Sequence, residues 1–495
     1  MRATAGTLTS SRLAPNRRVA QARAPRLGLD VARLCVVGLI VMAISRINQY
    51  FAWMTVLRPG LLLAGVAFAA LAFIPSAAAD KSWIRRPTTK MVIGIGLLSL
   101  GSIAFGISQG GAWYAFSQNF SKVLLTAFLL VAAIRNMRDL QIFVWAYVIG
   151  AGLLVWLSLF VYGMSMANSG LERLDTLYTW DANEVGLVLL VGIPLTLLAF
   201  RSSGRIGKLV AAAVLLGSVW TIALTGSRGA FLGLAVVVLV YLFSLKGTSV
   251  VRRVAVVAVM AVGLVFAAPE GYWKQMSTIT SVKEDYNWDA TQGRRELGIR
   301  ALKYMAEYPV FGLGVSQFGR AEATISDRAV NWRPGLPGIK WSVTHNSFLQ
   351  AGSELGVPGL VLFTLLVWTC IATPWRLRRR MPEDWASGDW EERFMFHAAA
   401  YLPLSAIAFA VSGFFVSFAY MDAIYILAAM TGALAFAVDR RLKDPLSSLA
   451  RPIARGHRVR ATVGVRARGT PATAKTIGSL VPDTVGPNRG RVPRT

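Results

Sequence analysis

The chain is poor in the residues that build cross-linked, redox and metal-binding proteins. Its 495 residues include only two cysteines and three histidines. Both cysteines, Cys35 and Cys370, lie in apolar runs, so we expect neither a disulfide framework nor a CxxC metal or redox site. The acidic residues are scattered, with no DxD pattern, and indicate no metal cluster. A glycine-rich FGLG stretch at Phe311–Gly314 lacks the strand–helix context of a nucleotide site, so we expect no cofactor.

Charge is absent from many long stretches of the chain. Charged residues make up only 16 % of it, whereas 55 % are hydrophobic. Several uncharged runs are long enough to cross the roughly 30 Å of a bilayer's hydrocarbon core. This pattern predicts an all-α, polytopic transmembrane bundle with about twelve spans. We place the spans at 31–47, 58–76, 91–108, 117–134, 140–163, 184–200, 209–226, 229–245, 254–269, 345–373, 394–416 and 422–438.

The basic residues gather on one side of these spans. If the N-terminus is cytoplasmic, the inner side holds 37 of the 52 lysines and arginines and 11 of the 25 acids. The outer side then holds 15 basic and 14 acidic residues. This is the positive-inside bias of a multi-pass membrane protein. The formal charge of +27 therefore indicates contact with membrane lipid and not with nucleic acid.

Two basic segments flank the membrane domain, which we place at 31–438. The N-terminal segment, 1–30, lacks an apolar stretch before a cleavage site, so we expect no cleaved signal peptide. The C-terminal segment, 439–495, carries 13 basic and 3 acidic residues. We expect both segments to be disordered and cytoplasmic. The C-terminal segment is either a solvated tail or, through its charge, attracted to anionic headgroups.

One connection, residues 270–344, is long enough to carry function, and the alternation of spans places it in the periplasm. Leu297, Ala301 and Met305 recur at helical spacing, which predicts an amphipathic helix that ends before Pro309. We expect two ion pairs at i,i+4 on its polar face. These pairs are Glu296 with Arg300, and Lys303 with Glu307.

The first turn of this helix holds two arginines that local pairing does not explain. A positive side chain at a helix N-terminus opposes the helix dipole. Arg294 and Arg295 therefore indicate an interaction with some other group.

Two further stretches place polar groups at the expected outer boundary. In Thr225–Gly229, TGSRG, two spans meet at Arg228, which is either a snorkelling arginine or a functional one. In Thr344–Leu360, THNSFLQAGSELGVPGL, His345 begins an apolar run. A histidine at a membrane edge is often structural. The other two histidines lie toward the inner side, so outward-facing imidazole chemistry would require His345.

Taken in order, these stretches resemble the O-antigen ligase and O-antigen polymerase superfamily over 181–360. The resemblance rests on DANE at Asp181–Glu184, then TGSRG, then GRRELGIRALKYMAEYPVFGLG, then HNSFLQ…ELGVPGL. The long outer loop and the number of spans are also similar. One departure is Gly298, where an aromatic residue is common in relatives.

The resemblance implies a glycosyltransferase of cell-surface polysaccharide or lipopolysaccharide assembly. Such enzymes move a glycan from undecaprenyl pyrophosphate to an acceptor hydroxyl, on a glycan, on lipid A core or on a protein. It implies that Arg228 and Arg294 bind the pyrophosphate and stabilise its developing charge, with Arg295 as a further binding residue. His345 would be the general base. Transfer would then be inverting and metal-independent, because arginine supplies the positive charge.

Two other classes of function fit a polytopic protein. A transporter or lipid-linked glycan flippase would show internal repeats and ionisable groups near the bilayer midplane. Neither is evident here. A non-enzymatic assembly scaffold is the other alternative. Whether an enzyme of this kind is a ligase, a polymerase or a protein O-glycosylating enzyme is not encoded in the motifs, which overlap between the three.

The distribution of basic residues makes a prediction about sidedness. Reporter fusions near Arg86, Arg205 and Arg379 should report a cytoplasmic location, and fusions near Asn287 and Ser326 a periplasmic one. The reason is the excess of lysine and arginine in the inner segments. A cytoplasmic signal from the long loop would contradict both the topology and a periplasmic site.

Overall fold

A computed structural model describes residues 30–74, 81–166, 172–175, 180–244, 249–281, 293–334, 338 and 341–443. The chain divides into a unit of residues 1–444 and a unit of residues 445–495, and the second unit lies outside the described residues. So do residues 1–29, which were expected to be disordered. The last helix continues to Lys443. The segment expected to be disordered from residue 439 therefore begins with five helical residues.

Helices make up nearly all of the described structure. Those before residue 226 are α1 (Val31–Ser45), α2 (Ile47–Tyr50), α3 (Ala52–Leu57), α4 (Pro59–Phe73), η1 (Lys81–Arg85), α5 (Pro87–Phe105), α6 (Gln109–Ala115), η2 (Phe116–Phe120), α7 (Ser121–Ala133), α8 (Met137–Phe160), α9 (Ala182–Ser202) and α10 (Arg205–Thr225). Those after it are α11 (Arg228–Ser244), α12 (Val250–Ala267), α13 (Tyr272–Ser277), α14 (Arg294–Glu307), α15 (Phe318–Thr324), α16 (Asp327–Val330), α17 (Ser347–Arg380), η4 (Glu383–Ala386), α18 (Trp390–Gly413) and α19 (Asp422–Lys443). Two short strands, β1 (Met164–Met166) and β2 (Glu172–Leu174), pair antiparallel, with Met164 opposite Leu174.

Each of the twelve expected spans coincides with a helix. Within the described residues, ten helical stretches are long and apolar enough to cross a membrane. The remaining two positions hold the shorter apolar helices α1 and α11. The all-α, multi-pass membrane fold is thus confirmed, while the number of spans stays a prediction between ten and twelve.

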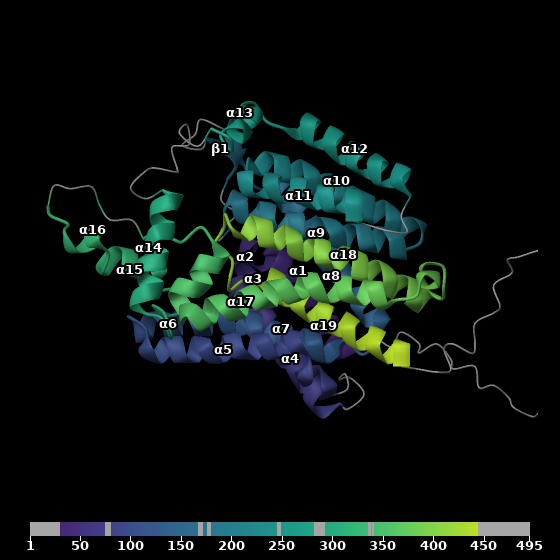
Figure 1. The fold of residues 1–495 in the computed structure, drawn as a ribbon, viewed down its shortest axis with the longest axis horizontal. Coiled ribbons are helices and arrows are strands. Elements are labelled where there is room, and N and C mark those ends of the chain that lie inside the picture. Colours follow the sequence, from purple (N-terminus) through teal and green to yellow (C-terminus); the bar gives the residue numbers. More distant parts are fainter. Residues whose placement is uncertain are drawn as a thin grey trace, which may run out of the picture. The chain divides into compact units, whose positions relative to one another are not determined.

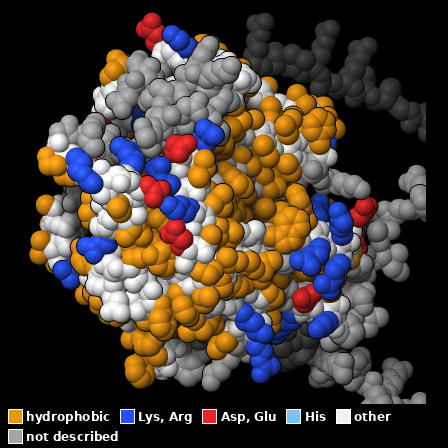
Figure 2. Space-filling view, turned by 60° about the vertical axis from the view of Figure 1, so that its left-hand side comes forward, with side chains coloured by type: hydrophobic (Ala, Val, Ile, Leu, Met, Phe, Trp, Pro, Cys, Tyr) orange, Lys and Arg blue, Asp and Glu red, His pale blue; other side chains and the backbone are white. Residues whose placement is uncertain are grey.

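The long helices run side by side, with some in the centre and others at the rim (Figure 1). α9 contacts α8, α10, α11 and α18, and α18 also packs against α17 and α19. Most residues of α9, α18 and α19 are buried, whereas α4 and α12 leave large apolar side chains exposed, such as Phe73 and Phe266. Figure 2 shows the resulting apolar surface with charged side chains gathered to either side of it. Such a surface suits lipid and not water.

Successive long helices run in opposite directions, so their termini lie at two ends of the bundle. α9 and α17 begin at the same end at which α10 and α18 finish, and α14, α15 and α16 lie beyond that end (Figure 1). We call it the loop end. The opposite end holds the links between α7 and α8 and between α17 and α18, together with the last turn of α19. We call it the basic end.

A break in α17 is the feature that positions the loop end. The helix has a non-helical residue, Gly356, with φ 75°. The loop 309–314 crosses the helix at this break, and the amide of Val357 donates to the carbonyl of Pro309 at 2.8 Å. The free helix ends at the break therefore satisfy part of their backbone hydrogen bonding through the loop.

Two glycines make this crossing possible. A Cβ at Gly312, which has φ 66°, would lie 2.4 Å from the backbone carbon of Glu354. A Cβ at Gly356 would lie 2.6 Å from the carbonyl oxygen of Pro309. Only glycine allows both the positive φ and the close backbone approach. The FGLG and ELG stretches of the sequence are thus two halves of one contact.

The Glu354 side chain completes the contact. Its Oε2 accepts a hydrogen bond from the amide of Ser316 at 2.8 Å, and its Oε1 accepts one from the amide of Phe318 at 3.1 Å. The residue is only 2 % exposed. A carboxylate that accepts two backbone amides fixes the loop after FGLG and starts α15.

The crossing predicts an unequal response to two glycine substitutions. Gly312→Ala should destabilise the fold by at least about 1–3 kcal/mol from its backbone conformation alone. Gly298→Ala, inside α14, should instead stabilise it by about 0.5–1 kcal/mol, because its Cβ would meet only Leu349 at 3.6 Å. Thermal unfolding of the purified protein measures both. Equal melting temperatures for the two variants would contradict the crossing.

Candidate functional site

A polar cavity of about 500 Å³ lies at the loop end. Its described lining comes from α6, from the start of α9, from α15 and the loop before it, from the first half of α17 and the segment before it, and from the link between α18 and α19. A volume of this size suits part of a large ligand. The ionisable lining residues are Asp181, Glu184, Arg320, His345 and Glu354.

The start of α17 is capped by residues next to His345. Asn346 is the N-cap, and its side-chain oxygen accepts the amides of Phe348 at 2.9 Å and Leu349 at 3.0 Å. The Thr344 hydroxyl donates to the carbonyl of Asn346 at 3.0 Å. The two bonds to the Asn346 side chain satisfy amides that a helix start otherwise leaves without partners.

The next polar residues of the same motif hold the link between α18 and α19. Ser347 donates from its hydroxyl to the carbonyl of Val416 at 2.7 Å and accepts the amide of Phe418 at 3.0 Å. The Gln350 side-chain oxygen accepts the amide of Ala419 at 3.0 Å. The polar residues of THNSFLQ therefore have structural explanations, apart from His345.

His345 faces the cavity from a constrained backbone. Its φ of 48° lies in the left-handed region, which histidine enters more readily than most residues. Within the described part of the chain its imidazole makes no hydrogen bond. Burial lowers the pKa of His345 from its ordinary value, Arg294 lowers it further, and Asp181 opposes the shift. The imidazole is consequently neutral near pH 7 and can accept a proton.

The TGSRG turn joins α10 to α11, as the sequence predicted. Thr225 accepts the amide of Ser227 on its hydroxyl at 3.2 Å, and Ser227 accepts the amide of Ala230 at 3.3 Å, which caps α11. Arg228 is partly buried, and its Nη1 donates to the hydroxyl of Thr278 at 2.9 Å, just after α13. Arg228 does not line the 500 Å³ cavity.

The two arginines at the start of α14 have different surroundings. The Arg294 guanidinium lies 6.0 Å from the centre of the Phe415 ring, and Phe415 lines the cavity. Arg295 is 54 % exposed in its side chain and pairs with Glu296 at 3.7 Å. Arg294 thus lies beside a residue of the cavity wall without lining the cavity itself, whereas Arg295 is largely exposed.

Phe415 is the point where the three motifs meet. Besides Arg294, it contacts the TGSRG turn, because a Cβ at Gly229 would lie 2.8 Å from the Cβ of Phe415. The hydroxyl of Ser412 also donates to the carbonyl of Gly229 at 3.2 Å. Phe415, which the sequence did not single out, therefore lies beside Arg294 and the TGSRG turn and lines the same cavity as His345.

Sequence reasoning missed several cavity residues. Asp181 and Glu184 were quoted only as part of the DANE stretch, yet they form a capping box at the start of α9 and line the cavity. Their spacing, an acid followed by Glu at the third position, is a capping signal that could have been recognised. Arg320 carries no such signal; it reaches the cavity on α15 and donates to the hydroxyl of Ser108.

The predicted ion pairs of α14 were wrong. The helix itself and its buried face, including Leu297 and Ala301, are confirmed. Arg300, however, pairs with Glu322 of α15 at 2.9 Å, and Lys303 pairs with Asp327 of α16 at 3.0 Å. These helices fold back onto α14 and bring acids closer to its cations than the i,i+4 partners.

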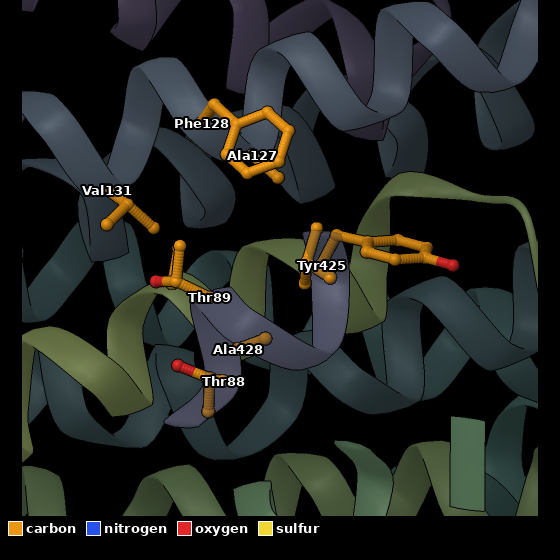
Figure 3. A pocket seen from close by; sticks show the side chains of 9 residues that line it. Thr88, Thr89, Ala127, Phe128, Val131, Tyr425 and Ala428 are labelled. Atoms are coloured by element: carbon orange, nitrogen blue, oxygen red, sulfur yellow. The ribbon is translucent and has the colours of Figure 1, made fainter. Parts of the chain in front are cut away.

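Two further observations concern other places where a ligand or a metal ion could bind. A pocket between α5, α7 and α19, lined by Thr88, Phe128 and Tyr425 among others, holds only about 10 Å³ (Figure 3). That space admits at most one water molecule. Among the described residues, no three His, Cys, Asp or Glu side chains gather as a metal site would require.

Residues 211–364 match the O-antigen ligase family. The matched region begins in α10 and ends in α17, so it contains Arg228, Arg294, Arg295 and His345. Over this region the expected resemblance to the O-antigen ligase superfamily is confirmed. The stretch Asp181–Glu184 lies outside the match. No curated protein matches the chain significantly.

The site of this O-antigen ligase-type membrane protein predicts a charge coupling. Arg294→Gln should raise the pKa of His345, because it removes a positive charge that disfavours the imidazolium. Arg295→Gln, the matched neighbour, should change it much less. Histidine-labelled NMR of the protein in nanodiscs can follow the titration, since only three histidines contribute. Equal shifts in both variants would argue against the arrangement.

Proposed function

We propose that the protein is an inverting glycosyltransferase that acts at the periplasmic face of a bacterial inner membrane. It transfers a glycan from undecaprenyl pyrophosphate to an acceptor hydroxyl in lipopolysaccharide or another surface polysaccharide. The observation that carries the proposal is that His345 lines a polar cavity and that Arg294 lies beside Phe415, a residue of the same cavity wall. The O-antigen ligase match over the same residues supports it.

Glycan transfer requires a base that takes the acceptor's proton and positive charge that stabilises the leaving pyrophosphate. As the acceptor oxygen attacks the anomeric carbon, its proton passes to His345. The bond from that carbon to the pyrophosphate oxygen breaks, and the electron pair remains on the pyrophosphate. Arg228 and Arg294 stabilise this negative charge, as guanidinium groups do for phosphate oxygens. A single displacement of this kind inverts the configuration at the anomeric carbon.

The charges around His345 fit a base that must also release its proton. Burial, and after it Arg294, lowers the pKa of the imidazole before reaction, while Asp181 favours the imidazolium once it forms. Such opposing neighbours place the pKa of a general base close to the working range. Arg295, exposed and paired with Glu296, is a peripheral contact for the donor.

The acceptor defines the finer function. A glycan hydroxyl would make the protein a polymerase, lipid A core a ligase, and a protein side chain an O-glycosylating enzyme. The mixed acidic and amide lining of the cavity, with Asp181, Glu184 and Gln350, supports a sugar hydroxyl as the acceptor, because these groups hydrogen-bond hydroxyls.

The test of the proposal is a transfer assay with the purified protein. A lipid-pyrophosphate glycan and an acceptor glycan should yield product in excess chelator, because arginine and not a metal ion neutralises the leaving group. A transporter or flippase would leave the donor intact. Activity that disappears with EDTA and returns with Mg²⁺ would contradict metal-independent transfer.

The assay also distinguishes the roles of His345. His345→Ala should lower turnover by roughly 10²–10⁴-fold. His345→Gln should be nearly as slow, since glutamine can hydrogen-bond but is a very weak base. The wild-type rate should fall as pH drops through the His345 pKa, with a midpoint below the ordinary 6.5. A Gln variant with near-normal turnover and an unchanged pH profile would exclude the base role.

A further inference from the structure

Trp341 is an exposed aromatic side chain in the wall of the 500 Å³ cavity that His345 also lines. The residue is 64 % exposed. Within the described part of the chain, its ring contacts no other aromatic ring and its indole nitrogen donates no hydrogen bond. A tryptophan inside a protein usually buries its ring and pairs its N–H. The exposed indole of Trp341 therefore has no explanation in the packing of the fold, and it suits a ligand that enters the cavity.

The backbone of Trp341 is held against α15. A Cβ at Gly319 would lie 3.4 Å from the carbonyl oxygen of Ser342 and 3.7 Å from the carbonyl carbon of Trp341. Trp341 and Val343 line the cavity at alternate positions before His345. His345 is four positions further along the chain than Trp341, and a chain segment of that length spans at most about 14 Å. The indole and the imidazole can therefore contact the same ligand.

Two polar side chains of the cavity wall have hydrogen-bonding capacity left for this ligand. Glu184 accepts the amide of Asp181 on Oε2 at 2.9 Å, and its Oε1 accepts no hydrogen bond from the described residues. Gln350 accepts the amide of Ala419 on its side-chain oxygen, and its NH₂ group donates to none of them. The cavity thus offers one acceptor and one donor, which is what hydroxyl groups require, because a hydroxyl both donates and accepts.

The charges of the cavity indicate an uncharged ligand on this side. Its described lining holds the acids Asp181, Glu184 and Glu354 and the single arginine Arg320. A pyrophosphate placed here would meet more acids than cations. A pyranose carries no charge and presents a face of C–H groups with hydroxyls around its edge. The C–H groups can lie against the negative face of an indole ring, while the hydroxyls bond to a carboxylate and an amide.

We propose that Trp341 binds a pyranose ring of the acceptor glycan by stacking, with Glu184 and Gln350 hydrogen-bonding its hydroxyls. This inference rests on the proposed function, because it assigns the acceptor side of the same cavity. It makes the acceptor a carbohydrate and not a protein side chain. Trp341 is a binding residue and takes no part in the bonds that form and break.

Sugar binding in the absence of a donor tests the proposal without any transfer. Saturation-transfer difference NMR on the full-length protein in nanodiscs can use the methyl β-glycosides of glucose, galactose and N-acetylglucosamine as probes. Wild type should transfer saturation to the ring C–H protons of at least one of them. Trp341→Ala should weaken that binding roughly 3- to 10-fold, and Trp341→Tyr, which keeps an aromatic plane, should restore most of it.

Trp332→Ala is the matched control. Trp332 belongs to the same connection and is 41 % exposed, but it does not line the cavity. This variant should bind the sugar like wild type. No saturation transfer to any of the three probes, or equal losses in Trp341→Ala and Trp332→Ala, would overturn the proposal. Equal losses in Trp341→Ala and Trp341→Tyr would overturn stacking as the mode of binding.

Steady-state kinetics separates this inference from the proposed function. Trp341→Ala should raise the acceptor KM roughly 3- to 10-fold and leave kcat nearly unchanged, because stacking acts equally on the ground state and the transition state. Wild-type protein that binds the sugar but transfers no glycan would refute the proposed function and leave the sugar site standing. Normal transfer with an unchanged acceptor KM in Trp341→Ala would refute the sugar site and leave the proposed function standing.

Discussion

The loop end depends on the crossing of two chain segments at Gly312 and Gly356. At this crossing the backbone hydrogen bonding within α17 is interrupted, and backbone groups of the loop 309–314 bond to those of α17. Glu354 then accepts two amides from the following residues. Since α14 precedes this loop and α15 follows it, the crossing sets where both helices stand. The first turns of α17 lie between the crossing and His345, which directly precedes the N-cap residue Asn346.

The electrostatics of the site follow from where the helices start. Arg228 and Arg294 occupy the first positions of α11 and α14, where the helix dipole disfavours a cation. A polyanion bound nearby would relieve that cost, since it would meet both the guanidinium groups and the helix N-termini. Burial lowers the pKa of His345, and the charge on Arg294 lowers it further. In the proposed mechanism one arginine would therefore act on both reactants: it would bind the donor and leave the base able to accept the acceptor's proton.

Sequence patterns predicted the features that depend on apolar runs and on the spacing of residues within one segment. Apolar runs gave a helix at each expected span, and the spacing of Leu297, Ala301 and Met305 gave α14. The sequence patterns did not predict contacts between segments that are far apart in the chain. The partners of Arg300 and Lys303 come from α15 and α16, which no spacing within α14 can reveal. Phe415, the residue around which the motifs gather, is an ordinary aromatic residue in sequence and gains its role only from packing.

The central claim is that the arginines hold the donor while His345 removes a proton, and the two roles separate in one measurement. Donor affinity and single-turnover rate can be determined side by side, in nanodiscs, for Arg294→Ala and His345→Ala. The account predicts that Arg294→Ala weakens donor binding and slows transfer, whereas His345→Ala slows transfer and leaves donor affinity close to that of wild type. A His345→Ala protein that loses donor affinity as severely as Arg294→Ala would contradict it.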